Sequence, residues 1–211
     1  MNQFLITNRN YVLRKVLNTQ ENIPIIKDLI EGFLNIHIET IELNDYLEEK
    51  DKYLPLEDNF GVADVRIKTD KNEEFNVGIS FLDGMHIQTK IALYYLYVHT
   101  NQICYNNKRL IAKTITINFL DFPYYHSYGY HKKAILNKFR TIDFKEEEAE
   151  THIIELPKFT ILDPNKMTKQ EQWISYLKGG KQEITNKVKR ENKYIRELDK
   201  KVHEYWINEK I

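Results

Sequence analysis

The clearest candidate for chemistry is an aspartate in the middle of a predicted β-hairpin. Residues 62–69 and 74–81 alternate apolar side chains with polar or small ones on either side of a short turn, a pattern that predicts two antiparallel strands. In the matching register Asp64 lies opposite Gly78, and Ser80 shares their face because side chains alternate along a strand. The opposite face gathers the apolar side chains and is expected to pack on the core.

Gly78 is unusual inside such a strand. A glycine in a strand interior weakens the strand, and it usually marks a close approach of another backbone or of a ligand. The geometry leaves two interpretations of Asp64 open. It is either a solvated residue on the outer face of the hairpin or a functional carboxylate between small neighbours.

The elements around the hairpin predict an α/β fold. Apolar residues at helical spacing predict helices at 11–17, 22–35 and 85–102 and from 179 onward. Runs rich in β-branched residues predict strands at 36–43, 110–120 and 151–159, and the acidic stretch 43–59 is expected to be a surface loop. This order indicates a mixed central β-sheet flanked by helices, with a long C-terminal helix.

Composition narrows the function classes. The chain has 211 residues, 42% of them hydrophobic, which is enough for one sizeable core. Lys+Arg and Asp+Glu both number 31, so any nucleic-acid-binding surface must be a local patch. The single cysteine, Cys104, excludes an internal disulfide, and no apolar run reaches 18 residues. These features predict a cytoplasmic protein that does not enter a membrane.

The hairpin and its neighbours resemble a known family. The stretch VADVRIKTDKNEEFNVGISF (62–81) resembles the core of the PD-(D/E)XK nucleases, in which an Asp on one strand precedes an acidic-x-Lys or acidic-x-Gln motif on the next. Residues 10–35 and 86–102 resemble the helices before and after that core. The pair THIIELPKF (151–159) and QEQWISYLK (170–178) is similar to the closing pattern of the recombination-promoting nuclease and transposase branch.

The resemblance covers roughly residues 8–178 and carries several expectations. It implies a restriction-endonuclease-like nuclease domain at 1–178 and a C-terminal helical extension at 179–211. It also implies metal-dependent cleavage of DNA, with Mg²⁺ as the cofactor and Asp64 as its ligand. Gly78 and Ser80 occupy the positions at which the family has Glu and Gln or Lys.

These two departures predict a catalytically impaired enzyme. Gly78 supplies no metal ligand, and Ser80 has neither the charge of Lys nor the reach of Gln. Losing both groups is expected to lower the rate by several powers of ten. Restoring Glu at 78 and Gln or Lys at 80 is therefore predicted to raise cleavage. The alternatives are a non-enzymatic nucleic-acid- or protein-binding module on a degenerate nuclease fold, and engineered substitutions at these two positions.

Replacement groups could come from other segments. Glu31, in the helix before the sheet, is where this fold often supplies an additional acid, and Lys90, about two turns into the helix after the hairpin, matches a basic position of the family. Glu74 flanks the turn. Each of the three is otherwise an ordinary surface residue.

Two further features have a functional and a structural interpretation. The segment 124–133 is rich in Tyr, His and Lys, which suits contacts to unpaired bases and phosphates or a packed aromatic connection.

The C-terminal helix carries an apolar stripe that must dock on the domain or on a second copy in a homodimer. The stripe consists of Ile184, Val188, Ile195, Leu198 and Val202.

Overall fold

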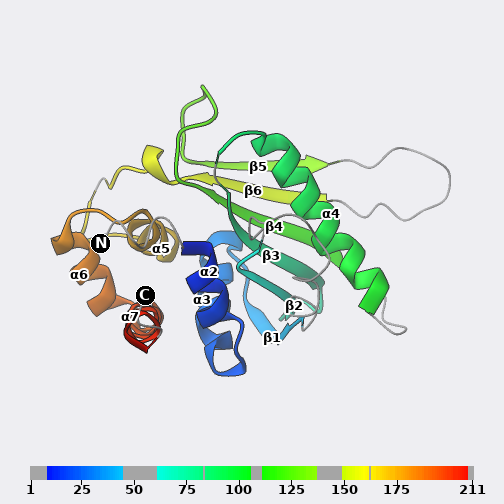
Figure 1. Ribbon diagram of the computed structural model, residues 1–211, viewed down its shortest axis with the longest axis horizontal. Coiled ribbons are helices and arrows are strands. Elements are labelled where there is room, and N and C mark those ends of the chain that lie inside the picture. Colours follow the sequence, from blue (N-terminus) through cyan, green and yellow to red (C-terminus); the bar gives the residue numbers. More distant parts are fainter. Residues whose placement is uncertain are drawn as a thin grey trace.

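A six-stranded mixed sheet forms the centre of the molecule (Figure 1). The computed structural model describes residues 9–44, 61–82, 84–105, 111–136, 149–161 and 163–208, and most of the loop predicted at 43–59 lies outside them. The strands are β1 (Ile38–Leu43), β2 (Ala63–Thr69), β3 (Glu74–Leu82), β4 (Lys113–Leu120), β5 (His131–Leu136) and β6 (Ala149–Glu155). Their order is β1-β2-β3-β4-β6-β5. The pairs β3/β4 and β4/β6 are parallel, and the others are antiparallel.

Helices cover both faces of this sheet. One face carries α3 (Ile23–Leu34), which contacts α5 (Lys169–Lys178) and α7 (Lys193–Asn208), while α2 (Arg9–Leu17) and α6 (Gln182–Glu191) pack against these helices. The other face carries α4 (Ile87–Tyr105), which contacts β3 and β4. Short 3-10 turns lie at Gln20–Asn22 and Leu156–Lys158. The predicted mixed α/β architecture is therefore confirmed.

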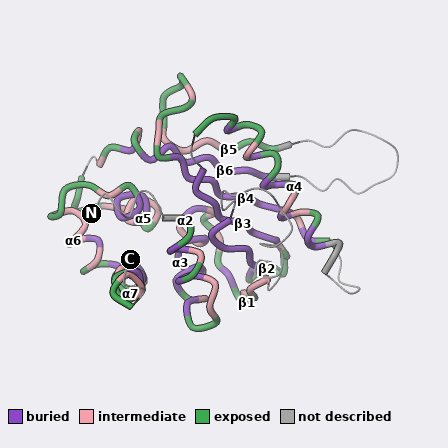
Figure 2. The backbone as a smooth tube through the Cα atoms, in the orientation of Figure 1, coloured by how far each residue is buried: buried purple, intermediate pink, exposed green. Residues whose placement is uncertain are grey.

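Two apolar clusters hold the layers together. The larger one lies between the sheet and α2, α3, α5 and α7, and it includes Val65, Ile67, Val77 and Ile79 from the hairpin. The smaller one lies under the first half of α4 and consists of Leu82, Ile87, Ile91, Leu120 and Ile153. Because alternate strand residues point to opposite faces, both faces of β2, β3 and β4 are buried, as Figure 2 shows.

The C-terminal segment differs from the single continuous helix that the sequence predicted. It is two helices, because Asn192 has an extended backbone and its side-chain oxygen accepts the N–H groups of Tyr194 and Ile195 at the start of α7. Ile195 and Leu198 are fully buried in the main cluster. The apolar stripe therefore packs on the chain's own domain.

The structure also contains an element that the sequence pattern did not predict. β5 begins at His131, inside the segment rich in Tyr, His and Lys, and it pairs antiparallel with β6 at the sheet edge. Within the part of the chain described here, no helix is long and apolar enough to cross a membrane.

Candidate functional site

The hairpin has the register that its sequence predicts. Asp64 pairs with Gly78 across β2 and β3, and Ser80 lies on the same face two residues further along. Of the two interpretations of Asp64, the solvated one is wrong, however. Asp64 is 1% exposed and Ser80 is fully buried, because α4 lies over them. Both faces of the hairpin are thus interior.

The helix α4 lies directly against the sheet at Gly78. A Cβ atom at this position would lie 2.6 Å from Val98 Cγ2 and 2.8 Å from Tyr94 Oη. The Tyr94 hydroxyl donates a hydrogen bond to the backbone oxygen of Ile79 at 2.9 Å. Burial, and secondly the charge of Asp64, raise the pKa of Tyr94 well above its usual value. Tyr94 and Val98 therefore occupy the space that a side chain at 78 would need.

Asp64 is held by amide side chains. Asn44 Nδ2 donates to Asp64 Oδ1 at 2.9 Å and to Asn76 Oδ1 at 2.7 Å. Asn76 Nδ2 in turn donates to the backbone oxygen of Val98 on α4, at 3.1 Å. This arrangement ties the end of β1 to the hairpin and to α4. It satisfies polar groups that would otherwise be buried without partners.

The described residues do not fit the Mg²⁺ site that the resemblance implied. Magnesium binds through one or two carboxylates and keeps several waters, yet Asp64 is 1% exposed and Gly78 offers no side-chain oxygen. Among the residues that the structure describes, no group of three or more His, Cys, Asp or Glu could hold a metal ion.

Ser80 belongs to a polar cross-link between strands. Its hydroxyl donates to Asn118 Oδ1 at 2.8 Å, and Asn118 Nδ2 donates to Thr151 Oγ1 at 2.9 Å. The Thr151 hydroxyl is also hydrogen-bonded to that of Thr116, at 2.6 Å. The Ser80 hydroxyl hydrogen is thereby used to join β3 to β4 and β6.

Glu31 is not brought to Asp64. It lies on α3, which packs on the opposite face of the sheet, and its carboxylate accepts the backbone N–H of Ile38 at 3.0 Å and pairs with Lys169 at 3.4 Å. Ile38 pairs with Thr69 at the far end of β2, which is five residues, or about 16 Å, from Asp64 along the strand. Glu31 therefore stabilises the start of β1 and the contact with α5.

Lys90 and Glu74 also have other surroundings. Lys90 lies on α4 one turn before Tyr94, and its Nζ is beside the backbone at Gly84, where a Cβ atom would lie 3.9 Å from it. Glu74 accepts a hydrogen bond from Arg66 Nε at 3.1 Å on the surface of the hairpin. Strand alternation puts Glu74 on the same face as Asp64, but at the turn end of the hairpin, four residues from Gly78.

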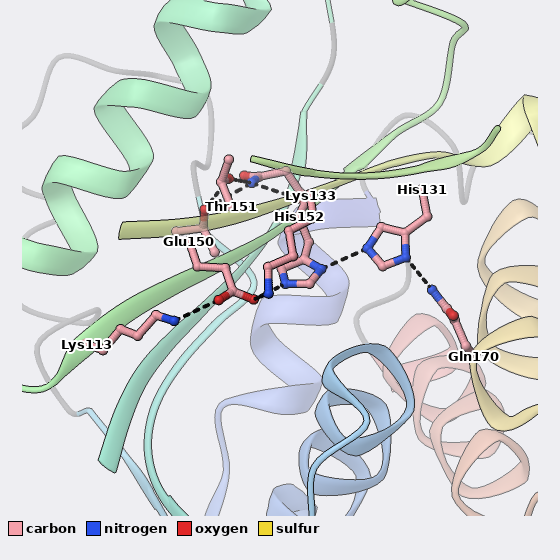
Figure 3. Close-up of polar contacts among 9 residues, drawn as sticks. Lys113, His131, Lys133, Glu150, Thr151, His152 and Gln170 are labelled. Carbon is pink, nitrogen blue, oxygen red and sulfur yellow. Dashed lines mark hydrogen bonds and ion pairs between the residues drawn. The ribbon is translucent and has the colours of Figure 1, made fainter. Parts of the chain in front are cut away.

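A second polar cluster lies at the other edge of the sheet (Figure 3). The buried Glu150 carboxylate receives Lys113 Nζ at 2.8 Å, Lys133 Nζ at 2.6 Å and His152 Nε2 at 2.7 Å. His152 Nδ1 lies 2.8 Å from Nε2 of His131. A series of hydrogen bonds thus runs from the buried Glu150 carboxylate through the imidazoles of His152 and His131.

This series of hydrogen bonds ends on α5, where the Nε2 atom of Gln170 lies 2.8 Å from His131 Nδ1. Every contact is satisfied when each imidazole donates from Nε2 and accepts at Nδ1. Burial, then the charges of His152 and Lys133, lower the pKa of His131 to about 4. The hydrogen bond from His152, opposed by burial and aided by Lys113 and Lys133, holds the pKa of Glu150 well below its usual value.

This cluster was missed by the sequence reasoning, although a signal was present. His152 lies in the predicted strand 151–159 and Glu150 directly precedes that strand, so an extension by one residue puts both side chains on one face. A buried strand face with Glu and His next to apolar neighbours requires polar partners. The sequence did not show which residues would supply them, because β5 was not predicted.

The segment rich in Tyr, His and Lys is divided between two elements. Residues 121–130 form the connection that leaves β4, and Lys132 and Lys133 belong to β5. Tyr128 is fully exposed and Tyr124 is 37% exposed, whereas Tyr130 packs edge-on against Phe159. One part of this segment is thus packed, as the structural interpretation predicts, and another part is exposed, where contacts to unpaired bases stay a prediction.

Comparison with known proteins gives one family. The family model described as PD-(D/E)XK nuclease family transposase matches residues 8–210. No curated protein and no solved structure matches the chain.

Proposed function

The chain belongs to the PD-(D/E)XK nuclease family transposases, and we propose that it is a nucleic-acid-binding protein whose phosphodiester-cleaving site has been lost. The observation that carries this proposal is the close packing of α4 on Gly78. The family resemblance puts an acidic metal ligand at this position, and here Tyr94 and Val98 fill the space instead.

The burial of Asp64 supports the same conclusion. A magnesium ion that keeps part of its hydration shell needs a carboxylate open to solvent and to substrate phosphate. Asp64 is 1% exposed, and one of its oxygens accepts a hydrogen bond from Asn44. In our proposal this carboxylate has become a structural acceptor between β1, the hairpin and α4.

The surroundings of Ser80 also support the proposal that the cleavage site has been lost. The third group of such a site orients or polarises the attacking water. The Ser80 hydroxyl is fully buried and donates to Asn118, so on this proposal it has no water to position. The position holds a strand cross-link instead of a catalytic side chain.

Nucleic-acid binding is the part of the family's function that does not need these groups. Nucleases of this kind bind a nucleic acid before they cut it, and binding rests on phosphate and base contacts distributed over a surface. Loss of the metal ligand at 78 and of the water-orienting group at 80 removes the chemistry and leaves the fold that presents such a surface.

Titration calorimetry with MgCl₂, together with fluorescence anisotropy of a labelled DNA oligonucleotide in EDTA, tests the proposal. We expect no Mg²⁺ binding that depends on Asp64 and clear DNA binding without metal. The matched control is Asp64→Asn, which keeps the side-chain shape and an acceptor for Asn44.

Magnesium binding that disappears in Asp64→Asn would overturn the lost-site proposal. Absence of binding to any DNA in EDTA and in Mg²⁺ would overturn the nucleic-acid part and favour a protein-binding module.

A further inference from the structure

The connection between β4 and β5 presents tyrosine rings to solvent. Residues 121–130 project beyond the edge of the sheet (Figure 1) and are mostly exposed (Figure 2). Tyr128 is as exposed as in an extended chain, at 104%, and Tyr124 is 37% exposed. The ring of Tyr124 is held edge-on against Tyr125, with centroids 4.9 Å apart.

The base of this connection is fixed by a buried ion cluster, which we term the Glu155 clasp (Glu155, Lys132 and Lys158). Glu155 is fully buried, and it pairs with Lys132 at 2.7 Å and with Lys158 at 2.9 Å. Its Oε1 atom also accepts the backbone N–H of Tyr124 at 2.6 Å and of Tyr125 at 3.0 Å.

The clasp also holds the loop from its other side. Lys158 Nζ donates to the backbone oxygen of Ser127 at 3.1 Å and to that of Tyr125. Burial opposes ionisation of Glu155, but the hydrogen bonds from Lys132, Lys158 and the two backbone amides lower its pKa to about 2. The carboxylate is thus charged at neutral pH and bound on all sides.

A buried charge is costly to desolvate and is tolerated only with such complete pairing. Fully satisfied polar networks make a segment rigid, so the clasp fixes the backbone from which the exposed rings project. A preorganised loop loses less conformational entropy on binding. Large aromatic rings displayed in this way are typical of binding surfaces, where Tyr is enriched.

The chemistry of the loop indicates what it binds. Lys132 Nζ lies 5.2 Å above the ring of Tyr125, and the clasp contains two lysines against one glutamate. Aromatic faces next to cations suit unpaired bases, which stack on the rings while the net positive charge of the clasp attracts the phosphates. Base pairs inside a duplex are already stacked and do not offer their faces.

We infer that residues 124–128, held by the Glu155 clasp, form a stacking platform for single-stranded nucleic acid, an assignment that rests on the proposed nucleic-acid-binding function. The platform begins where β4 ends, and the parallel strands β3, β4 and β6 all end at this edge of the sheet. Phe122 and Tyr125 pack against the cluster below α4, so platform and α4 share one face.

The experiment measures anisotropy of one labelled oligonucleotide, as a single strand and as a duplex, with the full chain and its variants. Tyr128→Ala and Tyr124→Ala remove rings without touching the clasp, which uses only the backbone of Tyr124. Each is expected to weaken single-strand binding by about tenfold and to leave duplex binding nearly unchanged. Tyr128→Phe keeps the ring and should bind as the unaltered chain does.

The chain offers a matched control. Tyr11 on α2 is also 37% exposed and has Lys15 Nζ 5.8 Å above its ring, but it lies on another part of the molecule. Tyr11→Ala should leave single-strand binding unchanged. Circular dichroism of all variants verifies that they fold.

Three outcomes would overturn the platform. If the chain binds DNA and the two alanine variants bind single strands as well as before, this inference fails while the proposed function stands. If the chain binds no nucleic acid at all, both fail. If light scattering shows a dimer that Tyr128→Ala dissociates, with DNA binding unchanged, the loop is a protein contact.

Discussion

The hydroxyl of Tyr94 would lie 2.8 Å from a Cβ atom placed on Gly78. It donates a hydrogen bond to the backbone oxygen of the following residue, Ile79, at 2.9 Å. The glycine and the tyrosine therefore depend on each other. The ring can come this close to the strand only because position 78 has no side chain, which is the close approach that an interior strand glycine indicates.

Gly78→Ala should destabilise the fold by about 1–3 kcal/mol, because the added methyl group overpacks a filled site. The penalty should shrink in a Val98→Ala background, since Val98 Cγ2 is the nearest atom to the new Cβ. Urea unfolding measures both effects.

The control for that series is Gly180→Ala, which has no heavy atom within 4 Å of its new Cβ. Its stability should stay the same or rise by less than about 1 kcal/mol. Equal losses at 78 and 180 would contradict the packing account.

Restoration of the family pattern should need more than the two substitutions that the sequence suggests. Gly78→Glu with Ser80→Gln places a longer side chain against Tyr94 and Val98, so this variant should be unstable and should not cut DNA. Adding Val98→Ala relieves the nearest contact and should recover part of the stability, but Tyr94 still lies against position 78 and Asp64 stays buried, so this variant should not cut DNA either. Mg²⁺-dependent plasmid nicking by the three-substitution variant that disappears when Asp64→Ala is added would contradict this and would show that Asp64 is still placed as a ligand.

Asp28 should be a strong determinant of stability. Its buried carboxylate accepts from Trp173 Nε1 at 2.9 Å and from Asn192 Nδ2 at 3.1 Å, and it pairs with Lys169 at 2.8 Å. Asp28→Ala leaves these donors without an acceptor and should lower the free energy of unfolding by about 3–5 kcal/mol.

The matched control is Asp199→Ala, which removes the partly exposed ion pair with Lys189 and should change stability by about 0–1 kcal/mol. Similar effects of the two substitutions in thermal unfolding would mean that Asp28 does not join α3, α5 and α7.

Acid should destabilise the protein first through His131. Its pKa is about 4 in the folded chain, against an ordinary histidine pKa of 6.5, so between these values the unfolded chain binds a proton that the folded chain does not. Stability is therefore expected to fall as the pH drops from 6.5 toward 4. His131→Gln should flatten that part of the curve in urea unfolding at several pH values, and the exposed His203→Gln should leave it unchanged.

Glu150 should affect the pH dependence of stability in a lower pH range than His131 does. Its folded pKa is held below the unfolded value, so its contribution is present above about pH 4.5 and is lost as the pH falls further. A curve in which His131→Gln alters only the region below that pH would contradict the assignment.

Much of the fold follows from the sequence because local pattern determines it. Strand alternation and one tight turn were enough to pair Asp64 with Gly78, and helical spacing predicted α3 and α4. The burial of the polar face did not follow, because a row of Asp, Asn and Ser on a strand is typical of solvent exposure. Only the packing of α4 shows that these side chains are satisfied inside the protein.

The edge of the sheet was harder to predict for a different reason. β5 carries His131, Lys132 and Lys133, whose side chains are polar, and it is stabilised by the ion pairs of Glu150 and Glu155 rather than by an apolar pattern. Contacts between residues far apart in sequence create this strand. The division of the C-terminal segment at Asn192 likewise depends on the distant Asp28.

The most direct test of the proposed loss of the cleavage site is a time course of supercoiled plasmid cleavage in Mg²⁺ by the unaltered chain and by Asp64→Ala, purified identically. The account predicts that the two proteins leave the plasmid equally intact, since Asp64 is covered by α4 and position 78 has no ligand. Cleavage by the unaltered chain that Asp64→Ala abolishes would contradict it.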